Sequence, residues 1–270
     1  SIPFGDTLRI GDRVVPLQAV TLNVGVLYVF GMLSLGVYGV MMAGWSSSNN
    51  FALLGGQRAA ALMISAEIAI GASIMGVIMV YGSLNLMEIV RAQGVPLLPR
   101  VFGAWIPSWG VLTQPLAFIL FVTAGIAATK RIPFDMPEGE SEIIGYFVEY
   151  SGMKFGMFAM ADFLETVVIA GLTTSLFLGG WQVPYLQATG FVFPWGATLD
   201  LPHALVTLMQ IGAFSLKVVV MIFLMMLVRW TLPRFRYDQA MRLGWLGLFP
   251  LSILNIVLTG LVLLLVGPRA

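Results

Sequence analysis

The sequence predicts an all-α integral membrane protein, a polytopic bundle of about six transmembrane helices forming a single domain over residues 1–270. The first observation is composition: 59% of the residues are hydrophobic and 10% are charged, whereas soluble domains have roughly 25% charged residues. The second is pattern, because apolar segments close to the roughly 20 residues that cross a bilayer recur along the chain.

Six apolar segments are predicted spans, with bounds near residues 20–43, 54–80, 111–128, 155–177, 204–227 and 244–266. Glycine and other small residues recur inside them, as in LLGGQRAAALMISAEIAIGASIMG, and let helices pack closely in lipid. The chain begins with Ser1 instead of Met, and SIPFG resembles the tail of an earlier helix. We therefore expect a fragment or the remainder of a processed chain.

The rarer residue types exclude several kinds of site. The chain has no Cys, which excludes a disulfide framework, a thiolate cluster and a thiol nucleophile. A single histidine, His203, excludes a multi-histidine metal centre within this chain. The formal net charge of +1 argues against a nucleic-acid partner.

The distribution of Lys and Arg predicts the orientation in the membrane. With six spans, loops 44–53, 129–154 and 228–243 share one side and carry seven of these cations, against five on the other side. Because cytoplasmic loops are enriched in Lys and Arg, we expect the first side to face the cytoplasm.

An acidic segment fills the loop at residues 129–154 on that side. Its charged residues are Lys130, Arg131, Asp135, Glu138, Glu140, Glu142, Glu149 and Lys154. The D-x-x-E spacing from Asp135 is typical of a helix start, and Glu138, Glu142 and Glu149 form one stripe if that helix is continuous. Carboxylates gathered at a membrane face indicate handling of protons, cations or a polar partner. The alternative is a solvated amphipathic loop.

Ionisable residues also lie inside the predicted spans, namely Glu67, Asp162, Glu165 and Lys217. A charge at the centre of a span costs roughly 2.5–3.5 kcal/mol, so such residues usually face the interior and serve a function. Asp162 and Glu165 are three residues apart and share a helix face. Because two ionised carboxylates repel, we expect them to share a proton. The alternative for Glu165 is that it lines a water cavity.

The loop at residues 228–243, RWTLPRFRYDQAMR in its main part, is basic and aromatic. By itself it is typical of a cytoplasmic anchor. Beside an acidic loop, it could instead dock a soluble partner or line the entrance for a polar headgroup.

A family resemblance rests on KRIPFDMPEGESEIIGYFVEYSGMKFG, supported in order by LNVGVLYVFGMLSLGVYGVMMAGWSSSNNFALLG and RYDQAMRLGWLGLFPL. These stretches resemble the H subunit of NADH:quinone oxidoreductase, respiratory complex I, over almost the whole chain. The resemblance implies a subunit that anchors the peripheral redox arm, forms the membrane part of the quinone chamber and begins the proton path.

The resemblance also implies partners and a location. Quinone is the substrate, this chain alone binds no cofactor, and FMN and iron–sulfur clusters belong to partner subunits. Those partners are the peripheral quinone-site subunits and the small and antiporter-like membrane subunits. The expected location is the bacterial inner membrane, with a mitochondrial or chloroplast membrane left open.

Residues and resemblance together predict two groups of site residues. The proton path comprises Glu67, Asp162, Glu165, Lys217, Glu138, Glu140, Glu142 and Glu149. The quinone chamber and partner interface comprise Arg58, Arg131, Asp135, Arg229, Arg234, Arg236, Tyr237 and Asp238.

The chain departs from the family pattern at several positions. Many members have Glu at the position of Asp162, Tyr at that of Ala66, and some have Glu at that of Ser34. Glu165 is not an expected acidic position. The family's N-terminal helices and a basic loop are missing, so this chain alone should form an incomplete quinone entrance.

Two alternatives remain at this point. The first is the corresponding subunit of an ion-pumping hydrogenase or ferredoxin-linked complex, which uses no quinone. The second is a stand-alone proton or cation transporter, which Glu67 and Lys217 would fit. No inverted repeat of the kind common in transporters is visible in the sequence.

Overall fold

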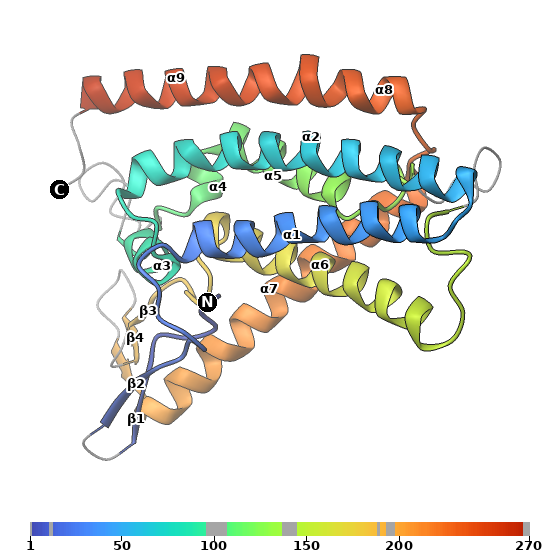
Figure 1. The fold of residues 1–270 in the computed structure, drawn as a ribbon. Helices are drawn as coiled ribbons and strands as arrows, with labels where there is room; N and C mark the ends of the chain where they lie inside the picture. Colours follow the sequence, from blue (N-terminus) through green and yellow to red (C-terminus); the bar gives the residue numbers. More distant parts are fainter. Residues whose placement is uncertain are drawn as a thin grey trace.

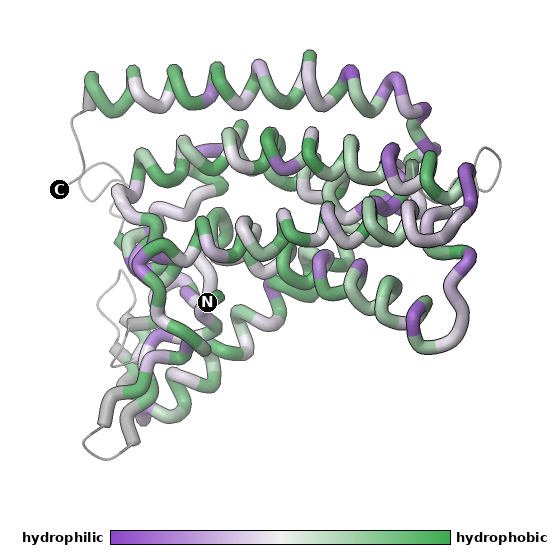
Figure 2. Tube along the Cα trace, in the orientation of Figure 1, coloured by the Kyte–Doolittle hydropathy of each residue, from purple (hydrophilic) through white to green (hydrophobic). Residues whose placement is uncertain are grey.

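The computed structural model describes residues 2–10, 13–95, 107–136, 145–187, 190–192 and 198–266. Long α-helices lie side by side in a tilted bundle, with short strands gathered at one end (Figure 1). The predicted all-α membrane fold class is confirmed. The helices are apolar along most of their length, and polar residues gather near their ends (Figure 2).

Five helices of the described residues are long and apolar enough to cross a membrane. They are α1 (Gly25–Ser46), α2 (Asn50–Tyr81), α6 (Met153–Phe177), α7 (His203–Thr231) and a continuous helix made of α8 (Tyr237–Arg242), the π-helical turn η1 (Leu243–Leu248) and α9 (Phe249–Val266). Each corresponds to one of the predicted spans, with ends shifted by a few residues.

The sixth predicted span, residues 111–128, is interrupted. It consists of α4 (Gly110–Thr113) and α5 (Pro115–Ala128), separated at Gln114, whose φ is −139°. Pro115 explains the break, because proline lacks an N–H and disfavours helical backbone in the residue before it. At 14 residues, α5 is shorter than the roughly 20 that a span requires.

The connecting segments contain elements that the sequence did not predict. They are α3 (Leu86–Gln93), the antiparallel hairpin of β1 (Thr7–Ile10) and β2 (Arg13–Pro16), and the antiparallel sheet of β3 (Leu186–Gln187), β4 (Gly190–Val192) and β5 (Thr198–Asp200). Residues 2–6, expected as the tail of a helix, are not helical. These elements are too short to produce a pattern at the scale of a membrane span.

The bundle has two distinct ends (Figure 1). The hairpin end holds α3, the strands, the start of α1 and the end of α2. The loop end holds the α1–α2, α5–α6 and α7–α8 connections. The three loops that we predicted to share one side therefore meet at the same end of the structure.

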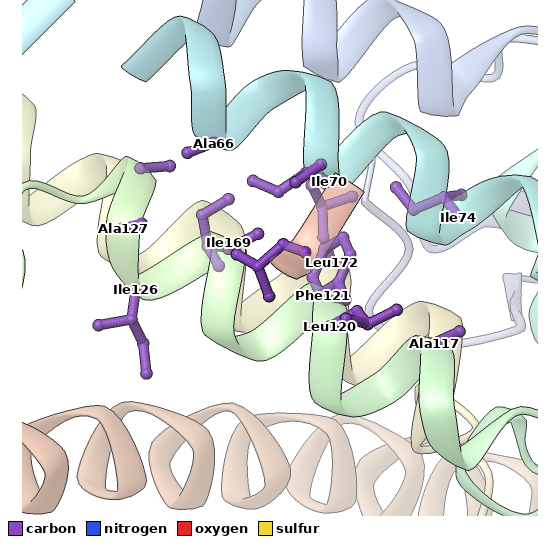
Figure 3. Close-up of a cluster of buried hydrophobic side chains, with 14 of the residues drawn as sticks. Ala66, Ile70, Ile74, Ala117, Leu120, Phe121, Ile126, Ala127, Ile169 and Leu172 are labelled. Carbon is purple, nitrogen blue, oxygen red and sulfur yellow. The ribbon is translucent and has the colours of Figure 1, made fainter. Parts of the chain in front are cut away.

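The core lies where α2, α5 and α6 meet (Figure 3). Ile70 of α2, Phe121 of α5 and Leu172 of α6 are each at most 1% exposed. Phe121 and Phe177 pack with ring centroids 5.4 Å apart. This contact fixes α5 against α6, so the chain leaving α5 enters the loop end beside the first half of α6.

Candidate functional site

A buried ammonium group lies beside two carboxylates at the loop end. The Lys130 Nζ atom is 2.7 Å from Asp162 Oδ1 and 3.9 Å from Glu165 Oε2. The three side chains expose 7%, 16% and 13% of their areas. The sequence predicted two carboxylates that repel each other on one helix face, and the structure adds the cation that offsets this repulsion.

The backbone directs Lys130 into this position. Lys130 follows α5 with a φ of 53°, in the left-handed region, which costs an ordinary residue roughly 1–2 kcal/mol. Its Nζ atom lies 5.8 Å from the ring centroid of Tyr146. Burial lowers the pKa of Lys130, but Tyr146, Asp162 and Glu165 outweigh burial and raise the pKa to about 12. The ammonium therefore stays charged at neutral pH.

Glu67 of α2 belongs to the same neighbourhood. Ser34 of α1 donates a hydrogen bond to its Oε2 atom at 3.0 Å, and the Glu67 and Glu165 carboxylates lie close enough to interact electrostatically. A cavity of about 450 Å³, the α1–α6 cavity, opens between α1, α2 and α6, and Lys130, Asp162 and Glu165 line it. Three predicted proton-path residues are thus brought together.

The Lys130–Asp162 pair also lines a second cavity, of about 190 Å³, which we call the loop chamber. Its lining residues are Thr129, Lys130, Arg131, Ile132, Asp135, Ala159, Asp162, Phe163 and Arg229. The Arg131 guanidinium carbon lies 4.5 Å from the ring centroid of Phe163. Three residues predicted for the quinone chamber, Arg131, Asp135 and Arg229, therefore surround one polar cavity.

An apolar slot of about 140 Å³ adjoins the loop chamber between α5, α6 and α7. The two cavities share Thr129, Arg131, Phe163 and Arg229. The remaining lining residues of the slot are Ile126, Thr166, Val167, Ile222, Met225 and Met226. A polar cavity that continues into an apolar one suits an amphiphilic ligand.

The α7–α8 connection packs against the start of the acidic segment. The Phe235 N–H donates to the Pro133 carbonyl at 2.9 Å, and the Phe235 and Phe134 ring centroids are 5.3 Å apart. Arg58 of α2 lies over the ring of Tyr237, 5.6 Å from its centroid. Two of the predicted interface residues, Arg58 and Tyr237, are thus in contact.

The other predicted residues of this connection lie nearer the surface. The Arg236 Nε atom is 3.4 Å from Asp238 Oδ2, and both side chains are largely exposed. Arg234 is half-buried. These three residues do not line the loop chamber as it is described.

Glu149 lies apart from Asp162 and Glu165, at the α1–α2 junction. Its Oε1 atom accepts a hydrogen bond from Asn49 Nδ2 at 2.7 Å. Residues 145–150 form turns, so the continuous helix required for one acidic stripe through Glu149 is not present. Tyr146 accounts for this, because its ring is buried against Phe147 and Phe158. Glu138, Glu140 and Glu142 lie outside the described residues.

Lys217 lies near the hairpin end, where α6 ends. Its Nζ atom donates to the carbonyl oxygens of Leu178, Gly180 and Gln182 at 2.8, 3.0 and 2.6 Å. It also lies 4.5 Å from the ring centroid of Trp109. An ammonium group has three hydrogens, and each has a carbonyl acceptor here, so these contacts favour an anchoring role for Lys217.

Residues 1–260 match the family model described as NADH dehydrogenase. The chain belongs to the NADH dehydrogenase family. The resemblance seen in the sequence is thereby confirmed. The match does not favour the hydrogenase-type or transporter alternatives.

Curated relatives of the NADH dehydrogenase family cover almost the entire chain. A protein of Cytophaga hutchinsonii, named as the first H subunit of NADH-quinone oxidoreductase, is 42% identical over 98% of the chain and 71% of its own length. One from Geobacter metallireducens, named as the second H subunit of that enzyme, is 43% identical, over 97% and 70%. The H subunit of Thermomicrobium roseum is 42% identical, over 97% and 70%.

Sequence reasoning missed two residues of this site in the NADH dehydrogenase family member. Lys130 was counted among the charges of the acidic segment but not as a site residue, and Phe163 was not singled out. A signal for Lys130 was present, because the buried pair Asp162 and Glu165 required a nearby cation. Nothing in the spacing of Phe163 distinguished it from a lipid-facing residue.

Proposed function

We propose that the chain is a membrane subunit of a proton-pumping NADH-quinone oxidoreductase, where it forms part of the quinone chamber and the start of the proton path. Relatives about 42% identical over nearly the whole chain carry that subunit name. With no Cys and one His, the chain leaves flavin and iron–sulfur clusters to partner subunits. The loop end faces the cytoplasm of a bacterial inner membrane, where the peripheral subunits dock.

One observation carries this proposal, the continuity of the loop chamber with the apolar slot. A quinone has a polar ring with two carbonyl oxygens and an apolar isoprenoid tail. Arg131 and Arg229 offer donors to the ring carbonyls, while Phe163, Ile222 and Met225 suit the tail. Cationic donors also stabilise the negative charge that develops when the ring is reduced.

The proton path begins at the wall of the loop chamber in this proposal. Asp162 lines both the chamber and the α1–α6 cavity, so it faces quinone on one side and Glu165 on the other. Glu67 follows, with its hydrogen bond from Ser34. Quinone reduction in the chamber changes the charge beside Asp162, and the change passes along these carboxylates. The proton roles of Glu138, Glu140, Glu142, Glu149 and Lys217 stay predictions.

The test compares Arg131→Met and Phe163→Ala in the purified complex, by NADH:quinone reductase assays with long-tailed and short-tailed quinones. Arg131→Met should lower kcat/KM for both by about tenfold, because a charged hydrogen bond contributes roughly 1.5–3 kcal/mol. Phe163→Ala should raise KM mainly for the long-tailed quinone. Unchanged kinetics and inhibitor sensitivity in both variants would contradict the proposal.

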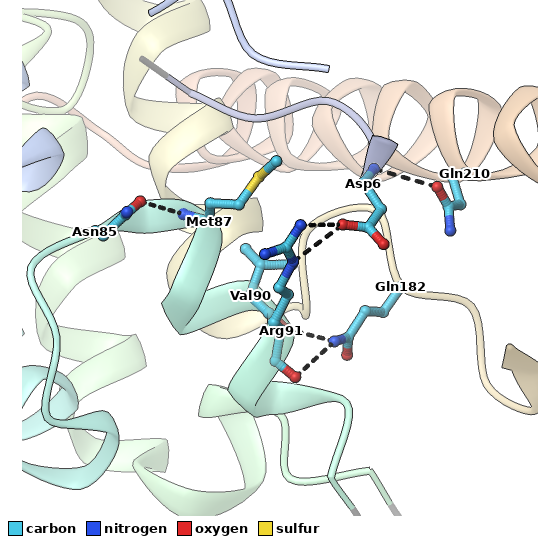
Figure 4. A network of polar contacts seen from close by, with 7 residues as sticks. All are labelled: Asp6, Asn85, Met87, Val90, Arg91, Gln182 and Gln210. Carbon is cyan, nitrogen blue, oxygen red and sulfur yellow. Dashed lines mark hydrogen bonds and ion pairs between the residues drawn. The ribbon is translucent and has the colours of Figure 1, made fainter. Parts of the chain in front are cut away.

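Arg91→Met is the matched control, since it removes an arginine at the hairpin end (Figure 4). Arg91 forms an exposed ion pair with Asp6 at 2.7 Å, and such pairs contribute about 0–1 kcal/mol. This variant should keep the wild-type kinetics. A loss equal to that of Arg131→Met would mean that removing any arginine disturbs the complex.

A further inference from the structure

The position of Lys130 has a consequence for protons at this site. One ammonium faces two carboxylates, Asp162 at 2.7 Å and Glu165 at 3.9 Å, and all three groups are nearly buried. If both carboxylates were ionised, the group would hold an uncompensated buried negative charge, which is strongly unfavourable. One ammonium, one carboxylate and one protonated carboxyl is the neutral combination.

We infer that Lys130 is a positioning residue that decides which of Asp162 and Glu165 carries the proton, so that a proton entering at Asp162 displaces one from Glu165 toward Glu67. This inference rests on the proposed function and adds a residue to it. The structure shows the resting arrangement, with Lys130 hydrogen-bonded to Asp162. In that arrangement Asp162 is the carboxylate and Glu165 the neutral acid.

The displacement balances in protons and charge. A proton from the loop chamber binds an Asp162 oxygen and neutralises it. The ammonium then has a stronger partner in Glu165, and closing the gap from 3.9 Å favours ionised Glu165. Its proton leaves for Glu67, whose other neighbour is the Ser34 hydroxyl. The group begins and ends with one ammonium, one carboxylate and one carboxyl proton.

The cavities support this direction. Lys130 and Asp162 line both the loop chamber and the α1–α6 cavity, whereas Glu165 lines only the second among the cavities of the described residues. A proton can therefore reach Asp162 from the chamber without passing Glu165. A lysine side chain has enough rotatable bonds to move by about 1 Å without backbone change.

Infrared difference spectroscopy on the purified complex tests the assignment without turnover. Glu165→Gln should remove one protonated-carboxyl band, because Glu165 is the neutral acid. Asp162→Asn should remove the same band, because Lys130 then pairs with Glu165 and ionises it. Lys130→Met should add a protonated-carboxyl band, and Lys130→Arg should restore the wild-type spectrum.

Two outcomes would overturn the inference. One is a protonated band that survives at full strength in Asp162→Asn. The other is loss of a carboxylate band, instead of a protonated one, in Glu165→Gln, and it decides the matter even if Asp162→Asn does not assemble. Asp6→Asn, which alters an acid at the hairpin end, is the control that should leave the protonated band intact.

Proton pumping separates this inference from the proposed function. Glu165→Gln should retain inhibitor-sensitive quinone reduction and lose protons pumped per electron, and Lys130→Met combined with it should lose no more, as expected for residues acting as a unit. Full pumping in Glu165→Gln overturns the displacement step alone. Absence of inhibitor-sensitive quinone reduction in the wild type overturns the proposed function, while the infrared assignment stands or falls separately.

Discussion

The Lys217 ammonium of α7 donates to the carbonyl oxygen of Gln182 at 2.6 Å, joining the middle of a long helix to the turn that follows α6. The same group holds the carbonyls of Leu178 and Gly180. Gln93 reinforces the turn, since its Oε1 atom accepts from the Gly179 N–H at 3.0 Å. The turn is thus fixed by side chains from both α3 and α7.

Lys217→Met should therefore destabilise the protein. Each hydrogen bond from a charged donor contributes roughly 1.5–3 kcal/mol, so we expect a loss of about 3 kcal/mol or more and faster proteolysis after α6. Thermal unfolding of the complex measures the loss. Lys217→Arg should retain most of the stability. If Lys217→Arg is stable but pumps fewer protons per electron, the predicted proton role is correct and the anchoring role is incomplete.

Gly76→Ala should disturb the packing of α2 against α9. A Cβ atom at Gly76 would lie 2.6 Å from Asn255 Nδ2, 3.0 Å from Gln114 Oε1 and 3.3 Å from Thr259 Oγ1. These amides and the hydroxyl are buried, so overpacking should cost about 1–3 kcal/mol. Gly71→Ala on the same helix meets nothing within 4 Å and should be stable. Equal thermal stability of the two variants would refute this interpretation.

Asn49 should control the order of the acidic segment near Glu149. Asn49 accepts from the Phe51 N–H as the N-cap of α2 and donates to Glu149. Asn49→Ser keeps a capping side chain but loses the contact, and Asn49→Asp keeps the cap and adds a like charge. Hydrogen exchange in residues 145–150 should rise from wild type to Ser and again to Asp. Identical exchange in all three would show that the contact does not order the segment.

Lys130 should not contribute to the pH dependence of activity near neutrality. Its pKa is raised from 10.5 to about 12, so its stabilising charge is fully present below 10.5 and is lost only as the pH rises through about 12. Quinone reductase activity below pH 10.5 should then have the same alkaline limb in wild type and Lys130→Arg. An alkaline limb that moves in this variant would show that Lys130 titrates much lower.

Local sequence patterns determined the helices of this protein and the end at which its charged loops gather. The spans near 54–80 and 155–177 were predictable because uninterrupted apolar runs leave the helix as the only structure that satisfies its backbone in lipid. Residues 111–128 were different, since the apolar run continued but Pro115 ended the hydrogen-bonding pattern at Gln114. Apolarity alone did not show that interruption.

The sequence by itself determined the fold class, the family and the presence of carboxylates in the membrane, because each rests on a local run or motif. Only the tertiary structure decided which charges meet. Lys130 reaches Asp162 across 32 positions of the chain, and Lys217 reaches Leu178 across 39. Ion pairs depend on how α5, α6 and α7 pack, and packing arises from contacts between segments that no local pattern contains.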